Sequence, residues 1–403
     1  MTMPLEGYRI LDMTTWVQCV TARMLGDLGA EVIKIEPQPS GDPYRGIMGW
    51  SKVVLGATPR NGPFEHANFN KKSIVLDLKQ EAGRKVLYEL VEKSDVFVHN
   101  LRRSATVKLG IDYATMSSHN PRLIYALSSG WGSNGPDEGK ASFDRLALAR
   151  SGIMSISGEP GAPPTYINGA IADHTGATMC ALGLIVALLM REKNGQGQEV
   201  ECSLLGSMMH LMSQNIDTKL ITDKEIPRQA RVDQGNPLWN EYRCSDDRWI
   251  SLGMLQPDRY WHSFCQLMRL EHLEKDPRFE NIVSRGQNAR QFIAILDETF
   301  ATKTRVEWLD ILRRGDIIVE PVNSVADLLE DPQVSANNYI DEFDHPTWGK
   351  TRLVVTPIRL GSSSASSIRL PAPEFGQHTE EVLQNILGYS WEDIIKLKDA
   401  GVI

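Results

Sequence analysis

The strongest constraint on the fold is an apolar run at residues 180–190, which follows the short polar segment 171–177. Wound as a helix, the run is apolar around its whole circumference, so we expect it inside the protein rather than on its surface. It is too short to cross a bilayer. The Asn194-Gly195 pair suits the turn that ends a helix, and residues 199–203 then alternate like a strand. The sequence therefore predicts a buried helix here.

Asp173 lies at the expected start of this helix. One interpretation is structural, because Asp is among the residues that cap a helix by accepting a hydrogen bond from a first-turn amide. The other is chemical. Ala172, Gly176 and Ala177 leave room for a substrate carbonyl, and carboxylates do form covalent intermediates. The local residues leave both interpretations open, with the cap favoured.

The charge balance excludes some classes of ligand. Lys and Arg number 43 against 51 Asp and Glu, and the formal net charge is -8. Such a chain is not drawn to nucleic acid or to an anionic membrane, so an anionic ligand needs a local basic pocket. Residues 1–9 lack the apolar core of a signal peptide, and no apolar stretch is long enough to span a membrane. We therefore expect a cytoplasmic protein.

Cysteine and histidine show no metal-binding pattern. No two of the five cysteines have the spacing of a metal-ligand pair, and the nine histidines form no set with a third ligand. We expect reduced, mostly buried thiols and no metal site.

Strands and helices alternate in the first part of the chain. We expect strands at residues 5–13, 31–36, 74–78, 95–100 and 123–127, with helices at 21–29 and 81–92. Strand, helix and strand in succession favour a parallel sheet. No Gly-x-Gly-x-x-Gly follows the first strand, so a nicotinamide or flavin cofactor has no support. The predicted fold class is α/β.

Polar side chains gather at the expected ends of these strands, at Lys79, Asn100, Arg102, Arg103 and residues 128–130. Ligands of open α/β sheets bind beyond the carboxyl ends of the strands. Any single one of these cations is more often a solvated surface charge. Several at corresponding strand ends in an acidic protein predict a pocket for a phosphate-bearing ligand.

The pattern changes after residue 221, where a charged, irregular segment runs to residue 234. A hairpin across residues 240–252 follows, and then helices at 258–268, 284–300 and 305–314, which together suit a compact α+β unit. A last helix is expected at 379–387. The predicted division is a large domain at 1–221, a small α+β domain at 222–324 and a return to the large domain at 325–403.

An ordered set of short motifs spans almost the whole chain: Pro4-Leu5-Glu6-Gly7, Gly29-Ala30-Glu31-Val32, Asn70-Lys71-Lys72-Ser73, Ala172-Asp173, Gly195-Gln196-Gly197-Gln198, Asp276-Pro277-Arg278-Phe279 and Gly376-Gln377-His378-Thr379. As a set they resemble the family III CoA transferases, the group that includes formyl-CoA:oxalate and L-carnitine CoA transferases. The resemblance implies an enzyme that moves CoA from an acyl-CoA to a carboxylic acid. Coenzyme A and acyl-CoA are then substrates, and no tightly bound cofactor is expected.

The resemblance also implies that Asp173 is the nucleophile. In this family the aspartate attacks the acyl-CoA carbonyl to give a mixed anhydride and CoA thiolate. The thiolate returns to give an aspartyl-CoA thioester, and the acceptor acid then takes CoA through a second anhydride. The chemical interpretation of Asp173 agrees with this, because a carboxylate needs no deprotonation at neutral pH.

The resemblance further implies a set of CoA contacts. These are Gln18, Leu76, Asp77, Leu78, Lys79, Asn100, Leu101, Arg102, Lys108, Ala141, Ser142, Phe143 and Asp144, with residues 76–79 at the adenosine and residues 141–144 beside the pantetheine thiol. The residues alone also allow Asp144 to be a helix cap.

Three departures from the family pattern bear on the substrates and the reaction. Pro37 stands where the formyl-CoA enzymes have an arginine, which removes support for the adenine contact of that arginine. The bulky segment 252–255 replaces their glycine-rich substrate loop, which argues against oxalate as acceptor. Phe143 stands where the racemase branch has a histidine and cannot exchange a proton, so transfer is favoured over racemisation. An acyl-CoA racemase or isomerase, or a non-catalytic CoA-binding subunit beside a catalytic paralogue, stay as alternatives.

The acceptor is expected to be an aromatic, branched or dicarboxylic acid. The bulky residues at 252–255 and Trp50, Trp131 and Trp239 favour the first two, although tryptophans in a core or an interface are an equal alternative. Finally, the resemblance implies an interlocked-ring homodimer with a Rossmann-like large domain built from both ends of the chain. A homologous second subunit stays an alternative.

Overall fold

The computed structural model describes residues 3–47, 60–361, 363–364 and 366–403. These form two compact units, which we call the large unit (Met1–Met154, Tyr166–Lys224 and Ser335–Ile403) and the small unit (Ser155–Thr165 and Glu225–Val334). Each is described by itself below. The domain boundaries drawn from the sequence stay predictions.

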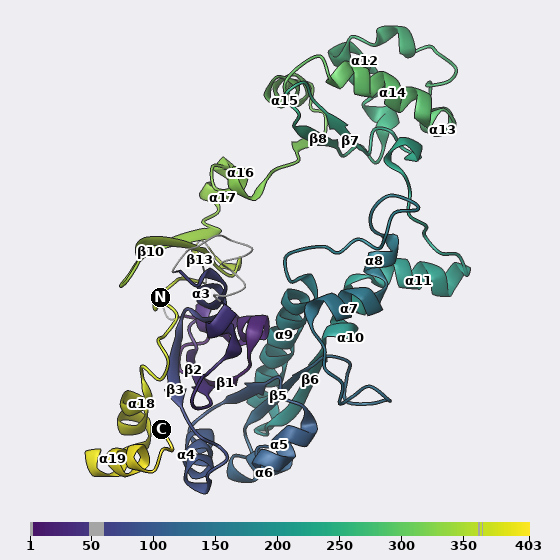
Figure 1. Cartoon of the computed structure of the whole chain (residues 1–403). Helices are drawn as coiled ribbons and strands as arrows, with labels where there is room; N and C mark the ends of the chain where they lie inside the picture. The colour runs from purple at the N-terminus through teal and green to yellow at the C-terminus, as the bar shows by residue number, and fades with distance from the viewer. Residues whose placement is uncertain (1–2, 48–59, 362, 365) are drawn as a thin grey trace. The chain divides into compact units, whose positions relative to one another are not determined.

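A six-stranded parallel sheet forms the centre of the large unit (Figure 1). Its strands, in spatial order, are β3 (Lys71–Val75), β2 (Glu31–Glu36), β1 (Arg9–Met13), β4 (Val96–His99), β5 (Ile124–Ser129) and β6 (Gln198–Ser203). This order is that of a doubly wound α/β sheet. The predicted parallel α/β architecture is confirmed.

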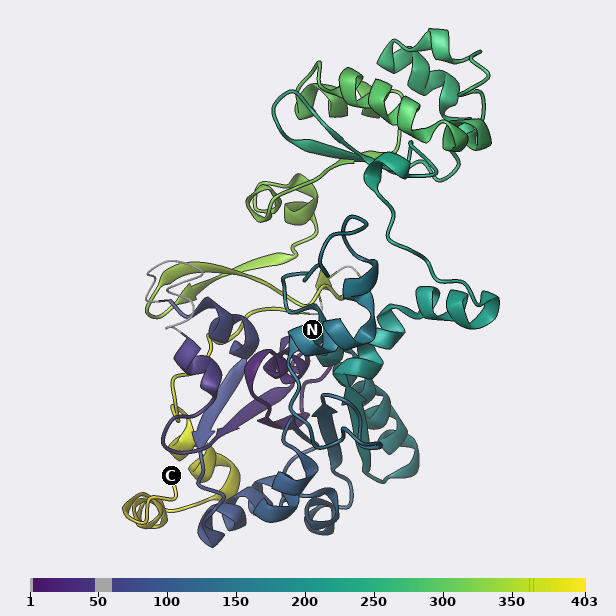
Figure 2. The ribbon, with the colours of Figure 1, turned by 45° about the vertical axis from the view of Figure 1, so that its right-hand side comes forward.

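Alternate residues of each strand pack on opposite faces of this sheet, because successive side chains point in opposite directions. Leu11 belongs to one apolar core with helices α4 (Glu81–Glu92), α6 (Tyr113–His119), α18 (Thr379–Leu387) and α19 (Trp391–Asp399). Its neighbour Ile10 belongs to a second core with α1 (Val20–Asp27) and α9 (Ile171–Asn194). Figures 1 and 2 both show the C-terminal helices beside β3 and α4, so the two chain ends build one unit.

The connections of the sheet diverge between β1 and β4. From β1 the chain proceeds outward through β2 and β3, and it then returns to place β4 on the other side of β1. The loops after β1 and β4 therefore leave in opposite directions and open a crevice at the carboxyl edge of the sheet, where doubly wound proteins bind ligands.

Helix α9 differs from its prediction in length and burial. It begins at Ile171, well before the apolar run, and of the helices in the described ranges it alone has the length and composition of a membrane span. The expectation that no stretch is long enough is therefore wrong. Its buried side packs on the sheet through Cys180, Leu184 and Leu188. Leu182 and Leu189 on its other side are 54% and 60% exposed, so the helix is not buried all round within this chain.

The remaining elements of the large unit surround this framework. They are helices α3 (Gly62–Asn68), α5 (Arg103–Leu109), α7 (Asp144–Ser151), α10 (Leu204–Leu211) and α11 (Ser213–Thr222), the 3-10 turns η1 (Trp16–Cys19) and η2 (Pro43–Ile47), and the hairpin of β10 (Ile340–His345) and β11 (Gly349–Val354).

The small unit is an α+β structure with its own core. Strands β7 (Glu241–Arg243), β8 (Trp249–Leu252) and β9 (Val319–Pro321) form an antiparallel sheet, which confirms the predicted hairpin. Its helices are α12 (Trp261–Met268), α13 (Ile282–Gln287), α14 (Ala289–Phe300) and α15 (Arg305–Arg314). Phe264, Phe292, Phe300 and Trp308 fill the core between them.

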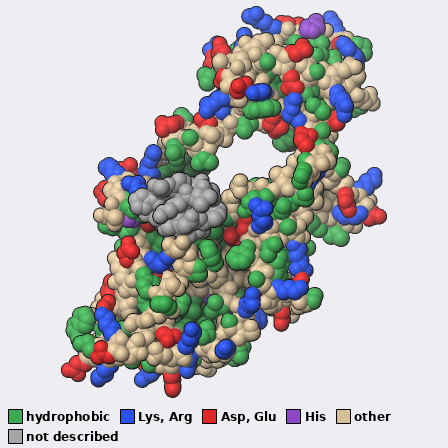
Figure 3. Space-filling model, viewed as in Figure 1, with side chains coloured by type: hydrophobic (Ala, Val, Ile, Leu, Met, Phe, Trp, Pro, Cys, Tyr) green, Lys and Arg blue, Asp and Glu red, His purple; other side chains and the backbone are tan. Residues whose placement is uncertain are grey.

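Acidic and basic side chains are interspersed over the face of the molecule seen in Figure 3. No large field of one sign covers that face, which agrees with the expectation that an anionic ligand depends on a local pocket.

Candidate active site

A cavity of about 310 Å³ opens at the carboxyl edge of the large sheet, at the divergence of β1 and β4. The loops after β1, β4 and β5 line it, together with the start of α9. Eight predicted site residues lie on its wall: Gln18, Asn100, Leu101, Arg102, Ala141, Ser142, Phe143 and Asp173. Segments far apart in the sequence thus meet where the strand ends predicted a pocket.

Asp173 is the third residue of α9, and its carboxylate is partly buried in the cavity wall. The pKa of this carboxyl is raised to about 6, first by burial and then by the nearby charge of Asp144, while a hydrogen bond from Gln18 acts to lower it. The group is therefore mostly ionised at neutral pH, yet it is a stronger base than a solvated aspartate. A desolvated carboxylate of this kind is suited to attack a carbonyl.

The cap of α9 is Asp144 and not Asp173. The capping position holds Ala170 in a left-handed conformation (φ +52°), with no side-chain hydrogen bond of its own. Instead the Asp144 carboxylate accepts hydrogen bonds from the backbone N–H of Ala172 at 2.8 Å and of Asp173 at 3.4 Å. The Tyr166 hydroxyl donates to the same carboxylate at 2.9 Å. Asp173 is thereby released from the capping role that its position suggested.

Gln18 links Asp173 to the end of β5. Its side-chain amide donates to the Asp173 carbonyl oxygen at 3.1 Å and to the carboxylate oxygen Oδ1 at 3.4 Å. The Ser128 hydroxyl donates to the side-chain oxygen Oε1 of Gln18 at 2.6 Å, which sets the orientation of the side-chain amide. These hydrogen bonds, from Ser128 to Gln18 and from Gln18 to Asp173, hold the Gln18 side-chain N–H next to the Asp173 carboxylate. A donor in that position can stabilise negative charge that moves when the carboxylate reacts.

Six predicted site residues do not line the cavity. Leu76 and Leu78 are buried in the core below the sheet edge, Asp77 accepts hydrogen bonds from Gln80 and the Lys79 backbone, and Lys79 is exposed. Lys108 is exposed in the last turn of α5. Asp144 lies behind Asp173 as the cap just described. Residues 76–79 follow β3, two strands from β1, or about 10 Å along the sheet edge.

The cationic side chains near the cavity differ in whether they already pair with a carboxylate. Arg103 also lines it, but it pairs with Glu199 at 2.8 Å and with Glu201 at 3.5 Å. Lys140 pairs with Asp137 at 2.5 Å. The exposed Arg102 side chain has no ion-pair partner in the described part of the chain, so its guanidinium is available to an anionic ligand.

Other cavity residues were missed by the sequence reasoning, or noted there only as polar strand ends. They are Thr15, Trp16, Arg103, Ser104, Leu127, Ser128, Ser129, Gly130, Gly132, Ser133, Glu138, Gly139, Lys140 and Leu204. The strand-end rule could find those after β4 and β5. Nothing in the local pattern distinguishes Trp16, which reaches the cavity through an unusual backbone conformation (φ +61°).

Neither thiols nor metal ligands are gathered at this site. All five cysteines are free thiols. In the ranges that the structure describes, no three His, Cys, Asp or Glu side chains are grouped as a metal site.

Comparison with known proteins identifies the family. The model of CoA-transferase family III matches residues 5–379. This chain belongs to CoA-transferase family III. It is 34% identical over 403 residues to (R)-2-hydroxy-4-methylpentanoate CoA-transferase of Clostridioides difficile, with 100% of both chains covered. It is 31% identical to cinnamoyl-CoA:phenyllactate CoA-transferase of Clostridium sporogenes, over 99% of this chain and 97% of that one.

A solved structure supports the fold. A CAIB/BAIF family protein from Brucella suis superposes with a TM-score of 0.85 at 26% identity, over 96% of this chain and 100% of that one. The family and the CoA-transferase activity expected from the sequence are thus confirmed. The individual site residues stay predictions, and they are argued next.

Proposed function

We propose that this CoA transferase uses Asp173 as its nucleophile and passes through aspartyl anhydride and aspartyl-CoA thioester intermediates. The observation that carries the proposal is the position of Asp173. Its carboxylate is partly buried in the cavity where the loops after β1 and β4 diverge, and the Gln18 side-chain amide lies beside it. Because Asp144 caps α9, the Asp173 carboxylate makes no capping hydrogen bond that it would have to give up when it reacts.

The proposed steps conserve charge and need no external oxidant, reductant or base. A carboxylate oxygen of Asp173 bonds to the acyl carbon, and the C–S bond breaks to release CoA thiolate. The thiolate then attacks the aspartyl carbonyl of the anhydride, forms a new C–S bond and releases the donor acid. The acceptor carboxylate attacks the aspartyl thioester, which forms a second anhydride and expels CoA thiolate. The thiolate then attacks the acceptor carbonyl of this anhydride, a C–S bond forms, and the breaking C–O bond releases the Asp173 carboxylate.

The cavity supports the CoA contacts in two groups. Residues 141–144 lie beside Asp173 and suit the thiol end of CoA, while Asn100, Leu101 and Arg102 line the same cavity at the end of β4. The free guanidinium of Arg102 suits a phosphate of CoA. Gln18, Leu76, Asp77, Leu78, Lys79 and Lys108 complete the proposed set, with residues 76–79 at the adenosine, farther along the sheet edge.

A racemase or isomerase is less well supported than a transferase. Racemisation needs a second acid or base facing the substrate α-carbon. Phe143, which precedes Asp144 in the chain, lies on the cavity wall, and no histidine is among the described residues that line the cavity. A non-catalytic subunit has no reason to keep a desolvated carboxylate in its pocket.

The acceptor acid is proposed to carry an apolar side chain. The two relatives described above are named for 4-methylpentanoate and phenyllactate substrates, which are branched and aromatic acids. Of the tryptophans cited for this purpose, Trp50 lies outside the described residues, Trp131 packs under Arg150 beside the cavity, and Trp239 is 43% exposed in the small unit.

A homodimer, interlocked as the family resemblance implies, is proposed on the exposed apolar side of the large unit. Leu182, Val186 and Leu189 of α9 are exposed, as are Leu220 and Ile221 of α11, at 76% and 82%. Monomeric proteins rarely leave so many large apolar side chains in water, which favours burial against a second chain. We also propose that the large domain is Rossmann-like and that the protein is cytoplasmic.

Intact mass spectrometry tests the nucleophile. The wild-type chain and Asp173→Asn are incubated with a panel of acyl-CoAs and then treated with borohydride, which reduces a thioester. Before borohydride we expect a CoA or acyl adduct that maps to Asp173 in the wild type. After borohydride we expect the aspartyl thioester to be reduced to an alcohol at residue 173, with release of CoA. Both products should be missing in Asp173→Asn. Asp393→Asn, an exposed carboxylate in α19, is the control and should form the adduct. No adduct with any donor, together with deuterium exchange at the acyl α-carbon, would overturn the proposal in favour of a racemase.

A further inference from the structure

Two aromatic side chains that the proposed chemistry does not use face the cavity that holds Asp173. The rings of Trp16 and Phe143 meet edge to face, with centroids 6.5 Å apart and planes at 83°. Phe143 is 58% exposed although it is large and apolar. This arrangement is a favourable one for aromatic pairs, and it leaves further ring surface open to a ligand.

Trp16 is held in a conformation that its own residue type disfavours. Its φ is +61°, in the left-handed region that non-glycine residues seldom adopt. Its backbone N–H donates to Asp42 at 3.3 Å, and its ring lies 5.7 Å from that of Tyr44. Backbone conformations of this kind persist where surrounding contacts enforce them, and they gather at functional sites.

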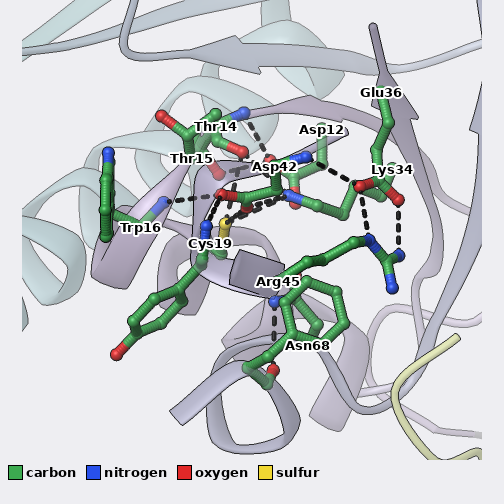
Figure 4. Close-up of polar contacts among 12 residues, drawn as sticks. Asp12, Thr14, Thr15, Trp16, Cys19, Lys34, Glu36, Asp42, Arg45 and Asn68 are labelled. Carbon is green, nitrogen blue, oxygen red and sulfur yellow. Dashed lines mark hydrogen bonds and ion pairs between the residues drawn. The ribbon is translucent and has the colours of Figure 1, made fainter. Parts of the chain in front are cut away.

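A buried network of charges enforces this conformation (Figure 4). Asp42 pairs with Lys34 at 2.8 Å, and the side chains of both are 1% exposed. The Lys34 ammonium also donates to the Thr14 carbonyl oxygen at 2.9 Å, and the Lys71 ammonium donates to the Cys19 carbonyl oxygen at 2.7 Å. Both ends of the segment 14–19 therefore accept hydrogen bonds from buried ammonium groups, and these contacts hold the backbone that carries the Trp16 indole.

Phe143 is equally unexplained by folding. It occupies the capping position of α7, where Ser, Thr, Asn or Asp is preferred, and it makes no capping hydrogen bond. Its backbone places Asp144 where the carboxylate caps α9, but that task does not require an aromatic ring at residue 143.

We propose that Trp16 and Phe143 form an aromatic wall that selects acyl groups with a bulky apolar side chain, aromatic or branched, over short or dicarboxylic ones. This rests on the proposed function, because it assigns the acyl end of the substrate to the cavity of Asp173. Apolar surface buried against the rings favours bulky groups. A second carboxylate placed there would lose its hydration without gaining a partner, so the wall disfavours dicarboxylic acids.

Binding measurements test the wall without depending on turnover. In the full chain carrying Asp173→Asn, calorimetry gives the dissociation constants of 3-phenylpropanoyl-CoA, acetyl-CoA and succinyl-CoA. We expect 3-phenylpropanoyl-CoA to bind at least about tenfold more tightly than either of the others. Adding Trp16→Ala or Phe143→Ala should reduce that preference to about twofold or less. Trp391→Ala, which removes an exposed ring in α19, should leave it unchanged.

The outcomes separate this inference from the proposed function. A parent protein without the preference, or a preference that survives both Trp16→Ala and Phe143→Ala, overturns the wall. Phe143→Ala keeps the test decisive if Trp16→Ala fails to fold, because the Phe143 ring is exposed. The proposed function fails separately, if the wild-type chain forms no covalent adduct and transfers no CoA while the binding preference is still measured.

Discussion

The Asp144 carboxylate accepts a hydrogen bond from the backbone N–H of Asp173, at 3.4 Å, and at the same time raises the pKa of the Asp173 side chain by its charge. One acidic group thus supports the helix that carries the second and also makes that second group more basic. Substitutions at residue 144 are expected to act on both properties.

The rate of the first acyl transfer should depend on the ionisation of Asp173. In the proposed mechanism the attacking group is the Asp173 carboxylate, whose pKa is raised to about 6 by burial and by Asp144, so the rate should rise with pH and reach half its plateau near pH 6. In Asp144→Asn the amide oxygen still accepts the Ala172 hydrogen bond, but the charge is gone, and the half-maximal point should move to lower pH. Single-turnover release of CoA thiol between pH 5 and 8 measures this, with Asp393→Asn as the unchanged control. An acid limb that stays in place would contradict the coupling.

Asp173→Asn should stabilise the folded protein at neutral pH. The pKa of Asp173 is about 6 when folded against a usual 3.8, so between these values the unfolded chain loses its proton first and the wild type is destabilised as pH rises. The difference in free energy of unfolding between variant and wild type should grow from near zero at pH 4 to about 1–3 kcal/mol at pH 7.5. Urea unfolding at both values of pH checks this. A variant that is less stable than the wild type at pH 7.5 contradicts it.

Gln18→Leu should slow the first acyl transfer by about tenfold or more, because it removes a donor beside the reacting carboxylate. It should also move the acid limb to higher pH, since the hydrogen bond from Gln18 lowers the pKa of Asp173. Ser128→Ala should have a smaller effect in the same direction, as it only frees the orientation of the amide. Stopped-flow thiol release gives both quantities. If Ser128→Ala were the more damaging change, the hydrogen-bond order would be wrong.

Lys71→Met should destabilise the fold strongly. The Lys71 ammonium lies 2.7 Å from the Asp12 carboxylate, and both side chains are fully buried. Removing Lys71 leaves the buried Asp12 carboxylate without its ion-pair partner, and breaking a buried pair in this way costs about 3–5 kcal/mol. Lys350→Met breaks an exposed pair with Glu342, at 2.9 Å, and should have a much smaller effect. Urea unfolding of the two variants compares them directly, and equal losses would contradict the assignment.

Periodicity and end signals predicted several elements to the residue. The helices at 81–92, 305–314 and 379–387 and the strand at 31–36 have the bounds expected from the sequence. α15, for example, begins after Thr304, whose side chain forms a capping box with Glu307, a signal visible in the residues themselves.

The predicted bounds of β3 are wrong, because the strand contains a buried charged side chain. The strand is predicted at 74–78 and lies at Lys71–Val75, because the polar residues 71–73 do not fit a local strand pattern. The buried Lys71 ammonium lies 2.7 Å from the Asp12 carboxylate of β1, and that pairing links residues far apart in the chain. A local pattern carries no sign of such a partner. The same holds for Trp16, whose place in the cavity depends on Asp42 and Lys34.

Two predicted helices also differ from those in the structure. The helix expected at 284–300 is broken into α13 and α14 at Asn288, whose side chain donates to the Arg278 and Ser284 carbonyl oxygens. The burial expected all around α9 is not found within one chain, since a sequence does not tell intramolecular burial from burial against a partner.

The side chain that caps α9 comes from another helix, α7, and this bears on when the site becomes complete during folding. A helix that carried its own capping side chain would be capped locally, whereas the first turn of α9 is capped only when α7 places Asp144 beside it. Without that arrangement Asp173 lacks the burial and the neighbouring charge that raise its pKa. With Asp173 as the proposed nucleophile, an unfolded chain should be inert toward thioesters, and acyl-CoA would meet the reactive carboxylate only in the folded enzyme.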